Sequence, residues 1–259
     1  MRPNYSIFLP LYNGDSHFDN ICLNIKKQKK KADQVIVVDD TKNSTYFINK
    51  LIEFLNCKNI TNEFKIIKNK NNFKPSKCWN LNYNLFRNKL VFRMDADDTW
   101  NEYHTTLMID EYLNDKSHLI YVQKNKINLF QKLIYNYDFI FTNQAVHSSA
   151  LLNLNNGKII YPNTDYPFDD LLMFIKYKYI KKKSVKFVDL NTSNTNLNVI
   201  NRWSERDNRK SKKLTLKKYF FLALKKKLSL KKISTFNVLK VFGNFNLLQS
   251  IYVIYKILR

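Results

Sequence analysis

The sequence predicts an α/β protein, with a mostly parallel central sheet and flanking helices in a Rossmann-like arrangement. Through residue 114, short apolar runs alternate with longer segments whose apolar residues recur at helical spacing, which is the pattern of repeated βαβ units. The runs are almost continuously apolar, as in residues 34–38, and this is typical of strands covered on both faces. Hydrophobic residues make up 44% of the 259 residues, enough for the core of one large domain.

The expected elements follow one another in strand–helix order. Each strand is a short apolar run, and each helix has one apolar face. Strands are expected at residues 5–11, 34–38, 63–68 and 90–94, and helices at 16–31, 45–56, 76–88 and 101–114. Beyond residue 118 the pattern weakens to strands at 118–123, 137–142, 146–152 and 185–190, a helix at 165–180 and a polar loop over 191–213.

Charge divides the chain into two parts. The net charge is +23, and residues 202–259 hold 16 basic and 2 acidic residues, which leaves +14 on this stretch. We therefore expect a folded domain over residues 1–205 and a helical, basic C-terminal extension over 206–259. A balance this basic favours anionic partners such as phosphates, anionic lipids or nucleic acid.

The extension has the pattern of an amphipathic helix. Apolar residues share one helical face, and lysines recur on another at seven-residue steps. The apolar set is Leu216, Tyr219, Phe220, Ala223, Leu224 and Leu228, and the basic set is Lys218, Lys225 and Lys232. Basic amphipathic helices bind anionic membrane surfaces. The other interpretation is a helix that packs on the domain and leaves its basic face in solvent.

The first residues form no signal peptide, and no run of about 18 apolar residues predicts a membrane span. We therefore expect a cytoplasmic protein that binds peripherally to the inner face of the cytoplasmic membrane. Cys22, Cys57 and Cys78 lack disulfide or metal-ligand spacing, which indicates reduced core thiols.

Acidic residues stand at the carboxyl ends of two predicted strands. Asp39 and Asp40 follow one strand, and Asp95, Asp97 and Asp98 follow another. Ligands of open α/β sheets bind outside these strand ends. The chain has no glycine-rich phosphate loop, so a bound diphosphate needs another partner. Carboxylates that share Mn²⁺ or Mg²⁺ with substrate phosphates can supply it. The alternative is a solvated acidic turn ahead of the helix expected at 101–114.

A third acidic pair, Asp169 and Asp170, opens an expected helix. One of these carboxylates could take a proton from an acceptor hydroxyl as a general base. The other interpretation is an acidic charge at a helix N-terminus, and the segment alone does not separate the two.

Five segments together resemble family 2 glycosyltransferases of the GT-A fold. In chain order they are SIFLPLYNGD, VIVVDDTKNST, SKCWNLNYNLFRNKLVFRMDADDTW, AVHSSALLN and PFDDLLMF. The match covers roughly residues 5–205, and the segments keep the family's order. MDADD, with its D-x-D motif, is the most specific of them.

The resemblance implies roles for the donor site. Pro10, Tyr12 and Asn13 would border the base and ribose of a nucleotide sugar, and Asp39 or Asp40 would accept hydrogen bonds from the nucleoside. Asn80, the residue that Cys78-Trp79-Asn80 keeps from the family's A-R-N, joins the same site.

The resemblance also implies the roles that carry the reaction. Asp95 and Asp97 would hold ribose and the Mn²⁺ or Mg²⁺ ion, with Asp98 close by. Asp169 or Asp170 would be the catalytic base of an inverting transfer. Asp170 is favoured, because it keeps the family's residue where Asp169 replaces Glu.

The segment 201–210 is an expected closing loop. Arg202 and Arg206 could reach a diphosphate, and Trp203 could stack on a sugar of the acceptor. The alternative is a polar linker. Val199 stands where processive relatives carry Gln, which argues against a processive synthase.

The resulting prediction is a hexosyltransferase-type enzyme that moves a sugar from a nucleotide-diphosphate donor, expected to be a UDP-sugar, to a glycan or lipid-linked acceptor. The setting implied is synthesis of lipopolysaccharide, capsule or another surface polysaccharide. The alternatives are a nucleic-acid or anionic-membrane binding protein, a nucleotidyltransferase, and a non-catalytic nucleotide-sugar binder. Nucleic acid is not an expected partner, because the charge lies mostly in the tail and no nucleic-acid motif appears.

Overall fold

The structure is a computed structural model. It describes residues 2–12, 14–41, 45–57, 60–69, 73, 75–124, 147–161, 173–174, 176–177 and 184–194. Among these residues, no helix has the length and hydrophobicity that a membrane span requires.

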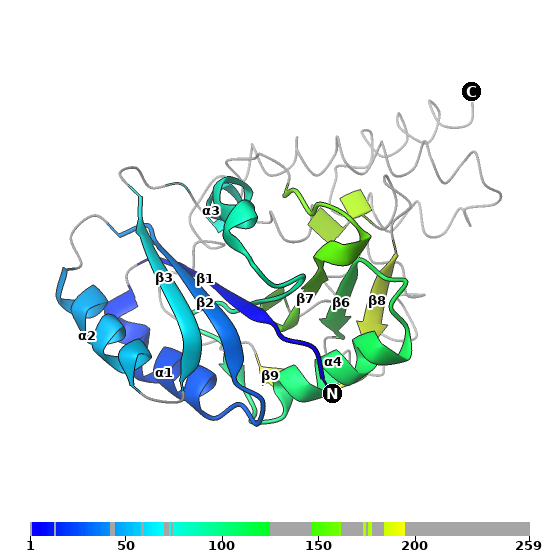
Figure 1. Ribbon diagram of the computed structural model, residues 1–259, viewed down its shortest axis with the longest axis horizontal. Helices are drawn as coiled ribbons and strands as arrows, with labels where there is room; N and C mark the ends of the chain where they lie inside the picture. The colour runs from blue at the N-terminus through cyan, green and yellow to red at the C-terminus, as the bar shows by residue number, and fades with distance from the viewer. Residues whose placement is uncertain are drawn as a thin grey trace, which may run out of the picture.

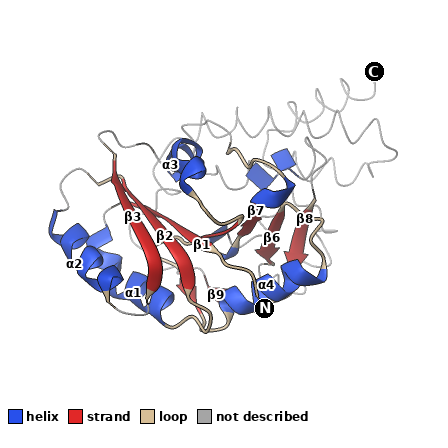
Figure 2. Cartoon of the chain, viewed as in Figure 1, coloured by secondary structure: helices blue, strands red, loops and turns tan. Residues whose placement is uncertain are grey.

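A seven-stranded sheet forms the centre of the molecule, in the order β3-β2-β1-β4-β7-β6-β8 (Figure 2). Its strands are β1 Ser6–Leu11, β2 Ala32–Asp39, β3 Thr61–Lys68, β4 Leu90–Arg93, β6 Ile120–Gln123, β7 Leu151–Asn153 and β8 Val185–Val188. Strand β7 runs antiparallel to both of its neighbours, whereas the other pairings are parallel. The predicted mostly parallel sheet is therefore confirmed, with one reversed strand that the sequence pattern did not predict.

Helices cover both faces of the sheet (Figure 1). They are α1 Phe18–Lys26, α2 Thr45–Asn56, α3 Pro75–Asn82 and α4 His104–Asn114, and short 3-10 turns occur at Gly14–His17, Tyr83–Leu85, His147–Ser149 and Leu154–Asn156. Helices α1, α2 and α4 lie on one face and α3 on the other. The connections from β1 to β3 therefore run over one face of the sheet. The connection from β3 to β4, which contains α3, runs over the opposite face.

Strand side chains point alternately to the two faces of the sheet, and each face has its own half of the core. Ile7 and Leu9 of β1 pack with the helices α1, α2 and α4, while Phe8 between them packs with Trp79 of α3. This alternation is expected because successive strand side chains point to opposite faces. Trp79 also stacks on Phe86 with ring centroids 5.1 Å apart, so α3 is fixed by aromatic packing as well as by burial of area.

Several predicted boundaries are wrong because tertiary hydrogen bonds end the elements early. The helix expected at 16–31 ends at Lys26, since the side chain of Gln28 and the backbone N–H of Lys29 donate to the carbonyls of Asn101 and Glu102. The helix expected at 101–114 begins at His104. The helix expected at 76–88 ends at Asn82, and a polar network holds the chain that follows.

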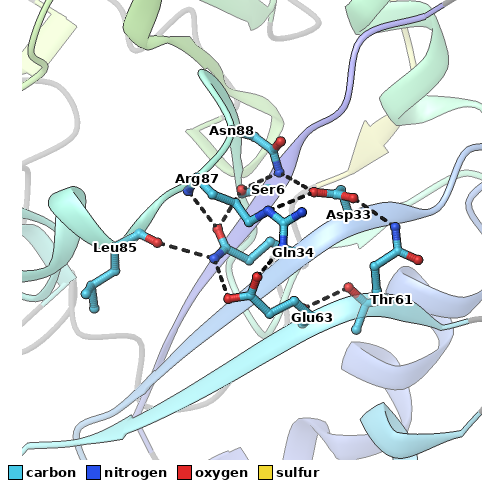
Figure 3. A network of polar contacts seen from close by, with 9 residues as sticks. Ser6, Asp33, Gln34, Thr61, Glu63, Leu85, Arg87 and Asn88 are labelled. Carbon is cyan, nitrogen blue, oxygen red and sulfur yellow. Dashed lines mark hydrogen bonds and ion pairs between the residues drawn. The ribbon is translucent and has the colours of Figure 1, made fainter.

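This polar network joins the amino-terminal ends of β1, β2 and β3 to the segment after α3 (Figure 3). Ser6, Gln34 and Glu63 lie side by side in register across the three strands. Gln34 accepts from Ser6 at 2.9 Å and from the Arg87 backbone at 3.2 Å, and it donates to Glu63 at 3.0 Å and to the Leu85 carbonyl at 3.2 Å. The Leu85 carbonyl and the Arg87 N–H thus bond to Gln34 and not within a longer helix.

The loop expected over 191–213 contains a strand where the structure describes it. Strand β9, Ser193–Asn194, pairs antiparallel with β5, Thr99–Trp100. The amide oxygen of Gln123 accepts from the backbone N–H groups of Thr192 and Ser193, each at 2.8 Å. The pairing thus depends on a buried glutamine from a distant strand, which a local pattern does not reveal.

Two further expectations differ from the structure. Residues 147–149 of the strand expected at 146–152 form a 3-10 turn, and β7 starts only at Leu151. Cys78 is buried as expected, but Cys22 is half-buried and Cys57 is exposed. The strand expected at 137–142 and the extension 206–259 lie outside the described residues, and of the helix expected at 165–180 only residues 173–174 and 176–177 are described.

Candidate active site

The candidate site lies where β1 and β4 separate. Strand β1 has β2 on one side and β4 on the other, so the strand order reverses beside β1. The crevice outside the carboxyl ends of the strands at such a point is where open α/β sheets bind ligands. Asp39 and Asp40 stand at the end of β2, and Asp95 follows β4. The expectation that both acidic groups share one edge of the sheet is therefore confirmed.

Pro10 fits this separation. Pairing of β1 with β4 stops at Phe8 and Arg93, and the Met94 N–H makes a last bond to the Phe8 carbonyl. The backbone groups of Pro10, two residues beyond Phe8, point to the same side as those of Phe8, but β4 no longer pairs with β1 there. Proline lacks an N–H, so it is tolerated where no ladder bond is needed. Tyr12 then leaves the sheet with 45% of its surface exposed.

The carboxylates after β2 are held by Asn69, the residue after β3. Its backbone N–H donates to the Asp39 carbonyl at 2.9 Å, and its amide donates to Asp40 Oδ1 at 2.8 Å and to Cys78 Sγ at 3.2 Å. Asp39 Oδ1 accepts from the Thr41 N–H at 2.9 Å. Asp40 is therefore fixed beside the α3 cysteine.

Cys78 lies beside the first acidic group, because the Asn69 amide donates both to Asp40 and to the Cys78 sulfur. Burial raises the pKa of its thiol to about 12, the charge of Asp40 adds to that rise, and the charge of Arg93 opposes it. Arg93 in turn donates to Asp95 of the second acidic group.

Asp95–Asp98 form a tight turn, with a bond from the Asp98 N–H to the Asp95 carbonyl at 3.3 Å. Two asparagines of α1 hold its backbone. Asn20 donates to the Ala96 and Asp98 carbonyls, and Asn24 donates to the Asp98 carbonyl, each at 2.8 Å. The turn is therefore tied to α1 and does not cap α4, which begins six residues later at His104.

The donor set of this turn fits a hard divalent ion in part. Asp95 and Asp97 are half-buried and Asp98 is buried. Within the described ranges, no three His, Cys, Asp or Glu side chains converge to hold a metal by themselves. Mg²⁺ and its analogues bind proteins through one or two carboxylates and take further oxygens from substrate phosphates and water. Carboxylates of the turn suit this mode, in which the substrate completes the site.

Asn80 has both of its amide groups on the backbone of Tyr161. Its Nδ2 donates to the Tyr161 carbonyl at 3.0 Å, and its Oδ1 accepts from the Tyr161 N–H at 2.9 Å. The asparagine thus holds residues 158–161 against α3. Its place in the donor site stays a prediction.

The remaining predicted site residues lie outside the described residues. They are Asn13, Asp169, Asp170, Arg202, Trp203 and Arg206. Asn194, eight residues before Arg202, is described, and it pairs with Thr99, the residue after Asp98. Asn194 therefore lies beside the acidic turn.

Comparison with known proteins agrees with this geometry. Residues 6–180 match the model of glycosyl transferase family 2, which is more than half of the chain. The chain belongs to glycosyl transferase family 2. The enzyme is therefore a glycosyltransferase, as its motifs predicted. The search of curated proteins gave no significant match.

Solved structures show the same fold as this glycosyltransferase. A complex of Staphylococcus aureus TarS, residues 1–349, with UDP-GlcNAc has a TM-score of 0.63 at 17% identity, over 89% of this chain and 68% of that one. The mannosyltransferase PcManGT of Pyrobaculum calidifontis, in complex with GDP-Man and Mn²⁺, has a TM-score of 0.57 at 16% identity, over 73% and 55%. At these identities the likeness establishes the GT-A fold, whereas substrates have to be argued from the site.

Four residues that hold the candidate site were not predicted from the sequence: Asn20, Asn24, Asn69 and Arg93. Arg93 carries a detectable signal, since it is a charged residue in the otherwise apolar strand LVFR. Asn20 and Asn24 are one helical turn apart on α1, but such spacing is common on solvated faces. Asn69 gave no signal, because its partner Asp40 is distant in sequence.

A basic hollow of about 500 Å³ lies at the opposite, amino-terminal edge of the sheet. Arg2, Lys29 and Lys30 line it, but Arg2 and Lys29 pair with Asp110 and Glu102 at 2.8 and 2.7 Å. The hollow is thus partly neutralised, and it lies away from the strand ends where the glycosyltransferase carries its acidic residues.

Proposed function

We propose that the enzyme is an inverting, metal-dependent glycosyltransferase, which moves a sugar from a nucleotide-diphosphate donor to an acceptor hydroxyl. The observation that carries this proposal is the acidic turn Asp95–Asp98 at the switch point of a family 2 chain, tied in place by α1 and by Arg93. Hydrogen-bonded preorganisation of this kind suits a site that must bind charge without rearranging.

The donor is expected to lie across the carboxyl ends of β1, β2 and β4. Pro10, Tyr12 and Asn13 would border the base and ribose, and Asp39 or Asp40 would accept from the nucleoside. Asp95 and Asp97, with Asp98 close by, would hold ribose and a Mn²⁺ or Mg²⁺ ion. When bound, that ion offsets negative charge on the diphosphate leaving group.

In the proposed transfer, the acceptor oxygen forms a bond to the anomeric carbon as the bond from that carbon to the diphosphate oxygen breaks. Asp170, or Asp169 beside it, would take the hydroxyl proton as general base. Attack from the face opposite the leaving group inverts the configuration. The nucleoside diphosphate leaves with the bonding electron pair.

A UDP-sugar is the proposed donor. The TarS complex contains UDP-GlcNAc, and the more distant PcManGT complex contains GDP-Man with Mn²⁺. Both bound ligands are sugar nucleotides, which supports the donor class. TarS has the higher TM-score and the larger coverage, which favours uridine over guanosine.

The closing-loop proposal for Arg202, Trp203 and Arg206 has support from β9. Arg202 follows Asn194 by eight residues, and an extended chain covers up to about 3.5 Å per residue. Asn194 lies beside the acidic turn, so the guanidinium groups could reach a diphosphate bound there. Trp203 is proposed to contact the acceptor sugar.

We further propose that residues 1–205 form the catalytic domain and 206–259 a basic extension that holds the enzyme on the cytoplasmic face of a membrane. The acceptor would then be a glycan or lipid-linked intermediate of lipopolysaccharide, capsule or another surface polysaccharide. The positive charge of the extension supports this location, because clustered lysines are attracted to anionic lipids.

The deciding experiment is thermal denaturation of the full chain with a panel of nucleoside diphosphates and nucleotide sugars, with and without Mn²⁺. UDP and UDP-sugars are expected to raise Tm only when Mn²⁺ is present. A ligand at about 100 times its Kd adds about 2.7 kcal/mol of stability, which a melting curve resolves. A response to RNA or DNA and to no nucleotide would contradict the proposal.

Two variants separate binding from transfer. Asp97→Ala is expected to abolish the Mn²⁺-dependent shift, while Asp170→Ala keeps it and loses sugar transfer by at least about 100-fold. Asp110→Ala is the matched control, because Asp110 pairs with Arg2 far from the turn. Normal Mn²⁺-dependent nucleotide binding by Asp97→Ala would show that the metal site is assigned wrongly.

A further inference from the structure

Arg93 is a buried cation beside the acidic turn. It is the last residue of β4, and only 3% of its surface is exposed. Its Nε and Nη2 donate to Asp95 Oδ1 at 3.1 and 3.0 Å. Both bonds use the same carboxylate oxygen, so the guanidinium fixes the direction of the Asp95 side chain.

The sheet and its neighbours fix the guanidinium in turn. The Arg93 N–H donates to the Ala150 carbonyl at 3.1 Å, and the next residue, Met94, donates to Phe8 at 3.0 Å. On the side-chain end, the guanidinium carbon lies 5.6 Å from the ring centroid of Tyr161. Arg93 is therefore anchored at its backbone and packed at its tip, as a side chain must be if it is to orient another group.

Burying the Arg93 guanidinium costs free energy. A buried guanidinium loses much of its hydration, and the attraction to a carboxylate such as that of Asp95 often fails to repay that loss. An apolar residue would continue the pattern of LVF in β4 without this penalty. Arg93 is too buried to cover a bound diphosphate directly, and its hydrogen bonds to Asp95 give it a route to the donor.

We propose that Arg93 is a positioning residue for the transfer, which holds the Asp95 carboxylate in the orientation that binds the divalent ion together with the donor diphosphate. The inference rests on the proposed function. Arg93 also offsets part of the negative charge of Asp95, Asp97 and Asp98, so the turn keeps its shape before an ion arrives.

A competing role has the opposite consequence. If the guanidinium merely competed with the ion for Asp95, its removal would strengthen metal binding, because two cations repel across a shared carboxylate. If it orients the carboxylate, its removal weakens metal binding. Residues that orient metal ligands typically change metal affinity 10- to 100-fold when they are replaced.

The test measures the Mn²⁺ concentration that gives half of the maximal thermal shift of the full chain, with UDP and GDP tried in parallel. Arg93→Met removes the charge and both bonds at similar volume, and Arg93→Lys keeps the charge with a single donor group. Arg87→Met is the matched control, since Arg87 also makes ion pairs, with Asp33 and Glu63, at the opposite end of the sheet.

The expected result is a rise of at least fivefold in half-saturating Mn²⁺ for Arg93→Met, partial recovery in Arg93→Lys and less than a twofold change in Arg87→Met. A smaller rise in Arg93→Met, or tighter binding, overturns the inference. A wild-type protein that shows no Mn²⁺-dependent response to any nucleotide overturns the proposed function instead, so the two failures are distinguishable.

A measurement on the wild-type protein decides the question if the Arg93 variants do not fold. The NMR signal of the Arg93 Nε–H group is expected to shift when Mg²⁺ and UDP are added together, whereas the signal of Arg87 does not. An Arg93 signal that stays unchanged at saturating Mg²⁺ and UDP overturns the inference.

Discussion

Two single side chains of α1 hold the backbone of the acidic turn. Asn24 is fully buried, and its two amide groups bond to the Asp98 carbonyl and the Trp100 N–H. Asn20, one turn earlier on α1, donates to two carbonyls of the same segment. Their amides satisfy backbone groups that would otherwise lose hydrogen-bond partners at a bend. The position of the carboxylates is thus set from α1.

At this scale we predict the effect of Asn20→Ala. The Ala96 carbonyl loses its side-chain donor and the Asp98 carbonyl keeps only Asn24, so the free energy of unfolding is expected to fall by about 1 kcal/mol. Half-saturating Mn²⁺ in the presence of UDP is expected to rise at least threefold, since the turn loosens. Both quantities come from thermal denaturation.

Asn62→Ala is the control for this prediction. Asn62 likewise donates one amide, to Asp33 Oδ1 at 2.8 Å, but at the amino-terminal edge of the sheet. It is expected to leave the Mn²⁺ response unchanged. Equal effects of the two substitutions on Mn²⁺ would mean that the asparagine of α1 serves stability alone.

Helix α4 begins with a histidine that joins two elements. His104 is fully buried, its ring lies 4.6 Å from that of Trp100, and its Nδ1 lies 2.8 Å from Thr192 Oγ1. The start of α4 is thereby fixed to β5 and to the chain before β9. Burial lowers the pKa of His104 to about 3, so the ring stays neutral in the folded protein under ordinary conditions.

This pKa predicts a pH dependence of stability. An unfolded chain protonates His104 below about pH 6.5, whereas the folded chain does not until about pH 3. The unfolded state therefore binds more protons between these values, and stability falls as pH falls through this window. At pH 4.5 the loss is expected to be about 2–3 kcal/mol relative to pH 7.5.

Urea denaturation of the wild type and of His104→Gln measures this contribution. The variant is expected to lose about 2–3 kcal/mol less than the wild type between pH 7.5 and 4.5. Hydrogen bonds lower the pKa of Asp33, chiefly from Asn62, and that of Glu63, chiefly from Arg87. Such carboxylates lose their contribution only as pH falls below their unfolded pKa of about 4. Identical pH profiles for the two proteins would refute the prediction.

At the scale of the whole molecule, most of the positive charge and the candidate site lie in different parts of the chain. The carboxylates of the candidate site lie at the carboxyl edge of the sheet, while residues 202–259 carry +14 of the net +23. Another basic run, Lys29–Lys31, lies at the amino-terminal edge. The extension is the stronger candidate for binding an anionic surface, because Lys29 of the other basic run already pairs with Glu102.

We predict that the full chain sediments with phosphatidylglycerol vesicles but not with phosphatidylcholine vesicles, and less so at high salt. Replacing Lys225, Lys226 and Lys227 by Gln is expected to weaken binding about 100-fold, at about 1 kcal/mol for each lysine.

The same replacement at Lys29, Lys30 and Lys31 is the matched control and is expected to leave vesicle binding almost unchanged. If this control loses binding and the substituted extension does not, the membrane surface lies at the amino-terminal edge and the proposal for 206–259 is wrong.

The sequence by itself determined the fold class, the family and the acidic groups. Period-two and helical patterns depend on local geometry, so they located β1 to β4 and α2 with small errors at their ends. The pair Asp39–Asp40 and the turn MDADD could be recognised because each is contiguous in the chain.

Only the tertiary structure decided what holds these groups. The reversal of β7, the pairing of β5 with β9, and the contacts of Asn20, Asn69 and Arg93 join residues through backbone and side-chain bonds that no local period encodes. Hydrogen bonds across the fold also ended α1 and α3 earlier than their patterns predicted. Local propensity amounts to less than 1 kcal/mol per residue, so a few buried hydrogen bonds are enough to override it.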